Sequence, residues 1–281
     1  MKPQLLILAI ACVASLALPQ AASAQEQRKN VSQCQAIAQG IPKAQFASFS
    51  TTAPVIPAVS EGEDVTFTFL GHSTFEIDTP GGIVIATDYN GIYQPSVTPD
   101  VVTMNKAHQT HYTLTPDPAI RHVLHGWSDI PGEKAKVDLV VGDAYIRNVT
   151  TDIRFSYGLG GSQQDGNSIF IFEIAGLCIG HLGHLHYELT DAHYTEIGRL
   201  DVVMVPVDGG LTMGPDSMSR VIKRLRASIV LPMHRRGPPV ERFLAMIGKE
   251  FDIQMAQNNT LTVSLRTLPR KPQIYVMRDV Q

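Results

Sequence analysis

The sequence predicts an α/β domain, and two patterns in the chain indicate it. Short alternating or apolar runs typical of β-strands occupy residues 65–104 and 137–181. From about Thr190 onward, amphipathic helices alternate with apolar strands, which is the order expected of an α/β protein. The chain has 281 residues, enough to bury a large core within one domain.

The first strand block is expected to form antiparallel strands joined by tight turns. VTFTF (65–69) alternates apolar and polar residues, FEID (75–78) follows, and a turn at Pro80-Gly81-Gly82 leads into IVIATD (83–88). VVTM (101–104) is a further short strand. It runs directly into a polar segment that carries two histidines, NKAHQTHYTLTP.

The later elements follow from the same two periodicities. Strands are expected within 137–149 and at 168–174, 177–181, 202–207, 229–234, near 260–266 and at 273–277. Helices are expected at about 190–199 and over two segments whose apolar residues recur at helical spacing. Those residues are Met218, Val221, Ile222 and Leu225 in the first segment and Val240, Phe243, Leu244 and Ile247 in the second.

The N-terminus reads as a secretory signal peptide. Residues 5–18 are almost wholly apolar, and Ala22-Ser23-Ala24 forms a small-x-small cleavage signature. We expect a signal peptide at 1–24 with cleavage near Ala24, an irregular lead-in at 25–60 and the α/β domain at 61–281. The apolar run is too short to favour a membrane span, and the expected location is the bacterial periplasm.

Composition narrows the classes of partner. Loss of Lys2 with the signal peptide changes the formal charge from −3 to −4, which argues against a nucleic-acid partner. Cys34 and Cys178 remain in the mature chain, and they either pair in an oxidising compartment or stay as buried thiols. Two cysteines so far apart form neither a zinc knuckle nor a redox motif.

Histidines gather where the expected strands end. The ends of strands and the loops after them carry much of the chemistry of α/β sheets. Neutral imidazole is also the commonest metal ligand. One such histidine is usually structural, but a shared metal centre would explain six of them: His72, His108, His111, His181, His184 and His234.

The ordered motifs resemble the metallo-β-lactamase fold. FLGHSTFEI, GGIVIATD, AHQTH, GLCIGHLGHL, VVMVPVDGG and IVLPMH follow one another between about Val65 and His234. The closest branch is similar to lactonase-like and N-acylphosphatidylethanolamine phospholipase D-like hydrolases. The resemblance implies a four-layer αβ/βα sandwich and metal-dependent hydrolysis.

The chain departs from the family's H-x-H-x-D-H motif. Lys106 stands for the first histidine and Thr110 for the aspartate, whereas His108 and His111 are kept. A later family histidine falls near Ser156. His184 takes the place of an aspartate after glycine, and His234 is the final histidine.

The resemblance therefore implies one metal ion, held by His111, His184 and His234 with His108 assisting. Three imidazoles with an open position suit catalytic zinc, and nickel, copper or iron stay open. Such a set adds no ligand charge, which favours a bound water with a pKa near ~7. His186 is a rival to His184, because both face the same side of an extended segment.

Three further residues are candidates for the chemistry. Lys106 has no lone pair for a metal, and we expect Lys106 or Thr110 to help hold an anionic group. Asp208 would orient a ligand or water, as would Asp88, and a capping or turn role is the alternative for each. His72, in its LGH turn, is expected to be structural.

The leading hypothesis is a secreted zinc hydrolase acting on a small-molecule ester, lactone, amide or phosphoester through metal-bound hydroxide. The alternative is a catalytically inactive relative that binds a ligand or metal in the periplasm. The missing motif carboxylates favour the alternative unless Asp208 or Asp88 reaches the site. The sequence leaves the oligomeric state open.

Overall fold

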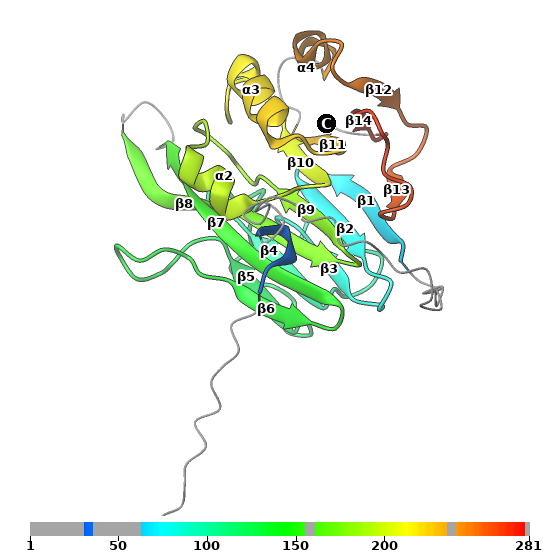
Figure 1. Cartoon of the computed structure of the whole chain (residues 1–281). Helices are drawn as coiled ribbons and strands as arrows, with labels where there is room; N and C mark the ends of the chain where they lie inside the picture. The colour runs from blue at the N-terminus through cyan, green and yellow to red at the C-terminus, as the bar shows by residue number, and fades with distance from the viewer. Residues whose placement is uncertain (1–30, 36–62, 155–160, 235–239, 279–281) are drawn as a thin grey trace, which may run out of the picture. The chain divides into compact units, whose positions relative to one another are not determined.

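Two β-sheets and three helices make up the described part of the chain (Figure 1). The computed structural model describes residues 31–35, 63–154, 161–234 and 240–278. The expected signal peptide and most of the expected lead-in lie outside these residues, so both stay predictions. No helix in the described residues is long and apolar enough to cross a membrane.

The first sheet has six strands in the order β13-β1-β2-β3-β4-β5. Its pairs are antiparallel except β3–β4 and β4–β5, which are parallel. The alternation of β1 places Val65, Phe67 and Phe69 in the core, as its period predicts. The strands are β1 (Val65–Gly71), β2 (Thr74–Asp78), β3 (Val84–Ala86), β4 (Val101–Met104), β5 (His122–His125) and β13 (Thr260–Val263).

The second sheet has eight strands in the order β12-β14-β11-β10-β9-β8-β7-β6. One half, from β6 to β9, is antiparallel, and the other half, from β9 to β12, is parallel. The strands are β6 (Asp138–Val141), β7 (Ala144–Arg154), β8 (Ser162–Ile174), β9 (Leu177–His181), β10 (Val202–Pro206), β11 (Ile229–Met233), β12 (Asp252–Met255) and β14 (Gln273–Val276).

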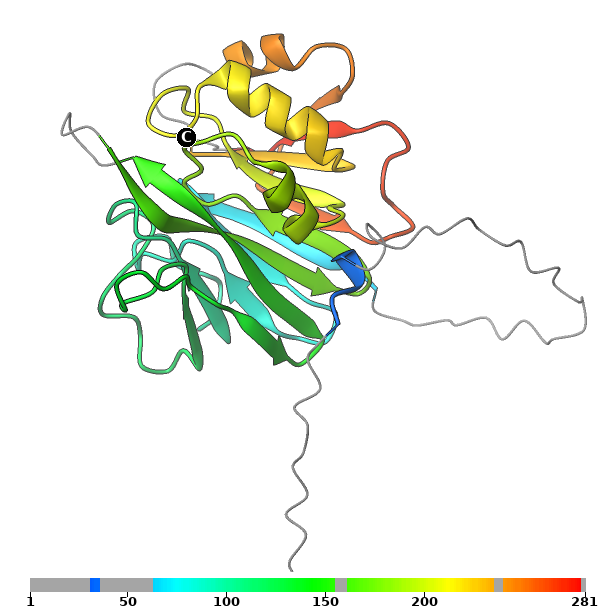
Figure 2. The same cartoon turned by 60° about the vertical axis from the view of Figure 1, so that its left-hand side comes forward.

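The helices lie beside the second sheet, as both views show (Figure 2). They are α2 (Asp191–Ile197), α3 (Pro215–Leu225) and α4 (Val240–Ile247). Both α3 and α4 bury the apolar stripe expected from their sequences, whereas α2 buries only Ile197. One apolar cluster takes side chains from both sheets and from all three helices. The α/β sandwich expected from the sequence is therefore confirmed.

Two strands were not expected from the sequence. The strand β5 lies at the edge of its sheet and every residue in it is half-buried, while every residue of β12 is exposed. Neither strand has the strong apolar alternation that marks a buried strand. Both form by adding to an edge that is already present.

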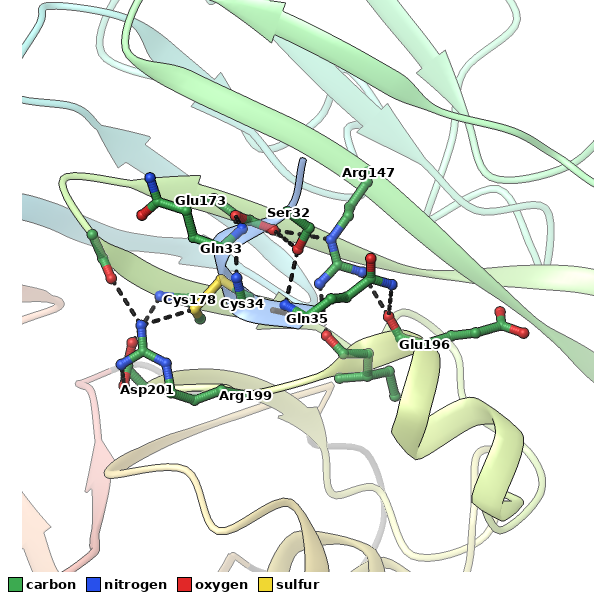
Figure 3. The surroundings of a disulfide bond; sticks show 12 residues. Ser32, Gln33, Cys34, Gln35, Arg147, Glu173, Cys178, Glu196, Arg199 and Asp201 are labelled. Carbon is green, nitrogen blue, oxygen red and sulfur yellow. Dashed lines mark hydrogen bonds and ion pairs between the residues drawn. A yellow bond between two sulfur atoms is a disulfide. The ribbon is translucent and has the colours of Figure 1, made fainter. Parts of the chain in front are cut away.

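A disulfide joins residues 31–35 to the second sheet, which settles the pairing that the sequence left open. Cys34 and Cys178 are bonded and buried (Figure 3). Beside the bond, the Glu173 carboxylate accepts hydrogen bonds from the backbone of Gln33 and from Ser32. Arg147 forms an ion pair with the same carboxylate, N to O 3.0 Å. The segment is thus fixed by one covalent bond and one buried charge.

Candidate metal centre

The candidate metal centre lies where strands of both sheets end. In the second sheet, His184, Asp208 and His234 come directly after the carboxyl ends of β9, β10 and β11. In the first sheet, Asp88 follows β3, and the segment with His108 and His111 follows β4. Parallel neighbouring strands bring such loops to one edge, and this explains why residues so distant in sequence meet.

His111 is fully buried and oriented by a carboxylate. Its Nδ1 atom lies 2.6 Å from Oδ2 of Asp88 and 3.0 Å from Oγ of Ser73. Asn105 donates to the other oxygen of Asp88 at 2.9 Å, which fixes the carboxylate. The Nε2 atom of His111 is buried and has no hydrogen-bond partner among the described residues. It therefore presents an unused lone pair to the centre.

His234 repeats this arrangement from the second sheet. Its Nδ1 atom lies 2.6 Å from Oδ2 of Asp208, a close contact whose direction departs from that of an ideal hydrogen bond. The Nε2 atom of His234 is buried and also lacks a partner in the described residues. A carboxylate behind a histidine whose other nitrogen is unused is the usual arrangement around a bound metal.

Asp208 is itself held by its own loop. The backbone N–H groups of Gly210 and Thr212 donate to its carboxylate at 2.9 and 3.0 Å, and Oγ1 of Thr212 donates at 3.0 Å. Burial raises the pKa of Asp208, but the contact with His234 and these donors outweigh it and lower the pKa below the ordinary value. Asp208 therefore stays a carboxylate.

A chain of imidazoles connects the rest of the cluster. The backbone N–H of Arg154 donates to Nδ1 of His186 at 2.6 Å, so a neutral His186 carries its hydrogen on Nε2. That hydrogen points to Nδ1 of His184, 2.7 Å away. His184 must then carry its own hydrogen on Nε2, which lies 3.0 Å from Nε2 of His108. Both nitrogens of His186 are engaged, so its role is to orient His184.

Thr110 extends this chain to a histidine that the sequence assigned to structure. Its Oγ1 atom lies 2.6 Å from Nδ1 of His108 and 2.9 Å from Nε2 of His72. The backbone of His72 also accepts a hydrogen bond from the N–H of His234, at 2.7 Å. The turn between β1 and β2 is therefore part of the centre.

Several residues of the centre have left-handed backbones. His72, Asp88 and His234 have φ of 54°, 42° and 52°. These conformations are unfavourable for residues other than glycine, and they concentrate at functional sites where the surrounding structure enforces them. Gly183, just before His184, has φ of +59° and packs against the side-chain amides of Asn105 and Asn167. The loop that carries His184 is thus closely confined.

The spacing of the rings fits a single ion. Ring centres of His108, His111, His184 and His234 are separated by 4.4 to 5.6 Å in all six pairs. Four imidazoles bound tetrahedrally to zinc through nitrogen would have centres about 5 Å apart. Two overlapping sets of residues could hold an ion, and within each set the ligand atoms lie within 4.8 Å of one another. The sets are His72, His108, His111 and His234, and His184, Asp208 and His234.

Burial keeps four histidines of the centre, His72, His111, His184 and His186, neutral. Desolvation, followed by the neighbouring histidines, lowers the pKa of His111 and His184 well below 6.5. The same causes lower the pKa of His72 to about 3. Desolvation and then the charge of Arg154 lower the pKa of His186 to about 4. At neutral pH these rings are uncharged, which is the state that a metal-binding histidine needs.

The structure brings together most of the residues singled out in the sequence. His108, His111, His184, His234, Thr110 and Asp208 lie in one cluster. Lys106 differs: it is exposed, and no described residue forms a hydrogen bond or ion pair with it. The position of Ser156 lies outside the described residues.

Two roles could not be recognised from the sequence alone. His72 was expected to be structural, yet it belongs to one of the two candidate ligand sets. Its sequence pattern is a histidine in the LGH turn, and this pattern does not indicate which later loops contact the turn. No sequence pattern marks Arg154, because its contacts depend on the paths of two other loops.

A family model described as a beta-lactamase superfamily domain matches residues 66–234. Among curated proteins, a UPF0173 metal-dependent hydrolase of Thermococcus kodakarensis is 24% identical over an alignment of 212 residues, and the match covers 67% of this chain and 95% of the relative. A UPF0173 metal-dependent hydrolase of Polaromonas sp. is 27% identical over an alignment of 246 residues, and that match covers 73% of this chain and 86% of the relative.

Solved structures agree with these sequence matches. A structure from Thermotoga maritima, assigned to the Zn-dependent hydrolases of the metallo-beta-lactamase superfamily, has a TM-score of 0.54 at 29% identity. The match covers 76% of this chain and 98% of that one. A structure from Parabacteroides distasonis has a TM-score of 0.55 at 12% identity, over 77% of this chain and 94% of that one, and supports the fold alone.

Proposed function

Since the chain belongs to the beta-lactamase superfamily domain family, whose relatives are named metal-dependent hydrolases, we propose that it is an exported zinc hydrolase. The proposed ligands of one zinc ion are His111, His184 and His234, with His108 assisting, so that a coordination position stays open for water. The observation that carries this proposal is the pair of buried, unused Nε2 atoms on His111 and His234, each backed by a buried carboxylate.

The residues around these ligands have separable tasks. A zinc ion bound here would acidify water and polarise a carbonyl or phosphoryl oxygen of the substrate. Asp88 and Asp208 hold His111 and His234 with their Nε2 atoms facing inward. Without metal, His184 carries its hydrogen on Nε2, so His184 would bind zinc through that atom only once the proton has passed to solvent.

Both carboxylates that could support catalysis reach the cluster. Asp88 and Asp208 are each within 2.6 Å of a histidine nitrogen. This favours an enzyme over an inactive binding protein, which was the alternative if neither carboxylate reached the site. Thr110 is proposed to contact the substrate. Lys106, exposed beside the cluster in sequence, is proposed to attract an anionic group, and the substrate class stays an ester, lactone, amide or phosphoester.

Export is proposed from two independent features. The first 24 residues have the composition of a signal peptide. The disulfide between Cys34 and Cys178 supports the same conclusion, because such bonds form and persist in oxidising compartments. N-terminal sequencing of the mature protein tests this directly, and a chain that keeps Met1 after expression in a bacterial host would contradict it.

Metal content tests the centre. We expect about one zinc ion per chain by elemental analysis of the mature protein, and loss of that ion in His111→Ala. His122→Ala is the matched control, since His122 lies on β5 and belongs to neither candidate ligand set. Two ions per chain would show the ligand assignment to be wrong, and none under zinc-replete conditions would end the hydrolase proposal.

Catalysis needs its own measurement. Hydrolysis of p-nitrophenyl acetate and of bis(p-nitrophenyl) phosphate should be abolished by a chelator and restored by zinc. Asp208→Asn should retain the fold and lose most of the rate. A zinc-loaded protein that hydrolyses neither class of substrate would favour the binding-protein alternative.

A further inference from the structure

Arg154, the last residue of β7, contacts two loops of the candidate metal centre at once. Its backbone N–H donates to His186, which orients His184. Its guanidinium Nη2 donates to three successive carbonyl oxygens, those of Gly210, Leu211 and Thr212, at 3.2, 2.8 and 2.5 Å. One residue therefore joins the loop after β9 to the loop after β10.

One of the carbonyls that Arg154 holds, that of Leu211, belongs to the same peptide group as an N–H that holds Asp208, that of Thr212. In a planar trans peptide the C=O and N–H bonds point in opposite directions. The peptide between Leu211 and Thr212 uses both: its oxygen accepts from Arg154, and its nitrogen donates to Asp208 at 3.0 Å. Turning this peptide to release Arg154 would also turn its N–H away from Asp208.

We propose that Arg154 is a positioning residue, whose guanidinium fixes the peptide plane between Leu211 and Thr212 so that its N–H holds Asp208 against His234. Its bearing on metal binding rests on the proposed function. Arg154 touches no ligand atom of the two candidate sets in the described residues, so it acts through Asp208.

The chemistry favours arginine for this task. A guanidinium presents several donors in a fixed plane and stays charged at every relevant pH, and a charged donor forms stronger hydrogen bonds to carbonyls than a neutral one does. Lysine keeps the positive charge and has three N–H donors, but its ammonium group is compact and is carried by a flexible side chain. Arg154→Lys should therefore retain part of the effect, whereas Arg154→Ala should lose it.

Hydrogen exchange tests the positioning role in the metal-free protein. We expect amides in a peptide spanning 208–214 to exchange roughly ten-fold faster in Arg154→Ala, and an intermediate amount faster in Arg154→Lys, because the peptide whose Thr212 N–H faces Asp208 loses its support. Peptides from β10 and β11 should be unchanged. Arg220→Ala is the matched control, since Arg220 is an exposed arginine paired with Glu188 on the surface. An unchanged exchange rate in 208–214 with Arg154→Ala would overturn the proposal.

Metal binding separates this proposal from the proposed function. Co²⁺ titrated into the metal-free protein gives a visible absorption spectrum that reports ligand geometry. We expect Arg154→Ala to bind Co²⁺ about 10- to 100-fold more weakly with an altered spectrum, and Arg154→Lys to recover part of the affinity. Equal affinity in a folded Arg154→Ala variant would overturn the link to the metal. If Arg154→Ala exchanges faster but the wild-type protein takes up no metal, the positioning role would stand and the proposed function would be wrong.

Discussion

Removal of the disulfide should cost the protein a large part of its stability. Cys34 and Cys178 are separated by 144 residues in sequence, so the bond strongly restricts the unfolded chain. The loop-closure relation for a loop of this size gives about 5 kcal/mol at 25 °C, near the upper end of what one disulfide contributes. The variant Cys34→Ala/Cys178→Ala leaves only small cavities, and we expect the free energy of unfolding to fall by about 3–5 kcal/mol.

Urea denaturation, followed by far-ultraviolet circular dichroism, measures this difference. The expected loss corresponds to a fall in Tm of roughly 10–20 °C for a chain of this size. The single variants should behave like the double variant, because either one removes the bond. A loss below about 1 kcal/mol would refute the reasoning, since it would mean that residues 31–35 contribute little constraint once the other contacts to Glu173 are made.

Three further predictions follow from buried groups. The free energy of unfolding of the metal-free protein, measured in urea, should fall as the pH is lowered from 7 toward 4. The pKa of His72 is about 3 in the folded chain and about 6.5 in the unfolded chain, so below pH 6.5 the unfolded chain binds a proton that the folded chain does not. Each fully buried neutral histidine steepens this dependence of the unfolding free energy on pH by up to about 1.4 kcal/mol per pH unit. An unfolding free energy that does not change between pH 7 and 4 would contradict the burial of these rings. Gly183→Ala should cost roughly 1–3 kcal/mol in thermal unfolding, because its Cβ would meet two asparagine amides at a positive φ; a neutral result would show that the loop can shift. Glu173→Ala should cost about 3–5 kcal/mol by leaving Arg147 buried without its partner, and combining Glu173→Leu with Arg147→Met should recover much of that loss.

Most of the secondary structure could be predicted from the local sequence. The alternation of β1 and the apolar stripes of α3 and α4 each depend on residues within one element, so their periodicity is readable without knowledge of the fold. The edge strands β5 and β12 were missed for the opposite reason. They are held by pairing to a neighbouring strand, and their own residues have weak preferences.

The residues of the candidate centre also fall into those that the sequence indicated and those that only the fold brought in. Histidines at strand ends and a family resemblance were enough to single out His108, His111, His184 and His234. They could not indicate that His72 would meet Thr110, because that contact joins a turn of the first sheet to a loop far along the chain. Lys106 shows the converse: it occupies the position of a metal ligand in the motif, yet the backbone after Asn105 directs it to solvent.

By itself, then, the sequence determined which residue types were available and at which strand ends they would stand. Only the tertiary structure decided which nitrogen of each histidine is engaged, which carboxylate stands behind it, and that Arg154 supports the loop of Asp208. The physical reason is that strand and helix periodicity arise from neighbours a few residues apart. The direction of a hydrogen bond across the centre depends on peptide groups brought together from different strands.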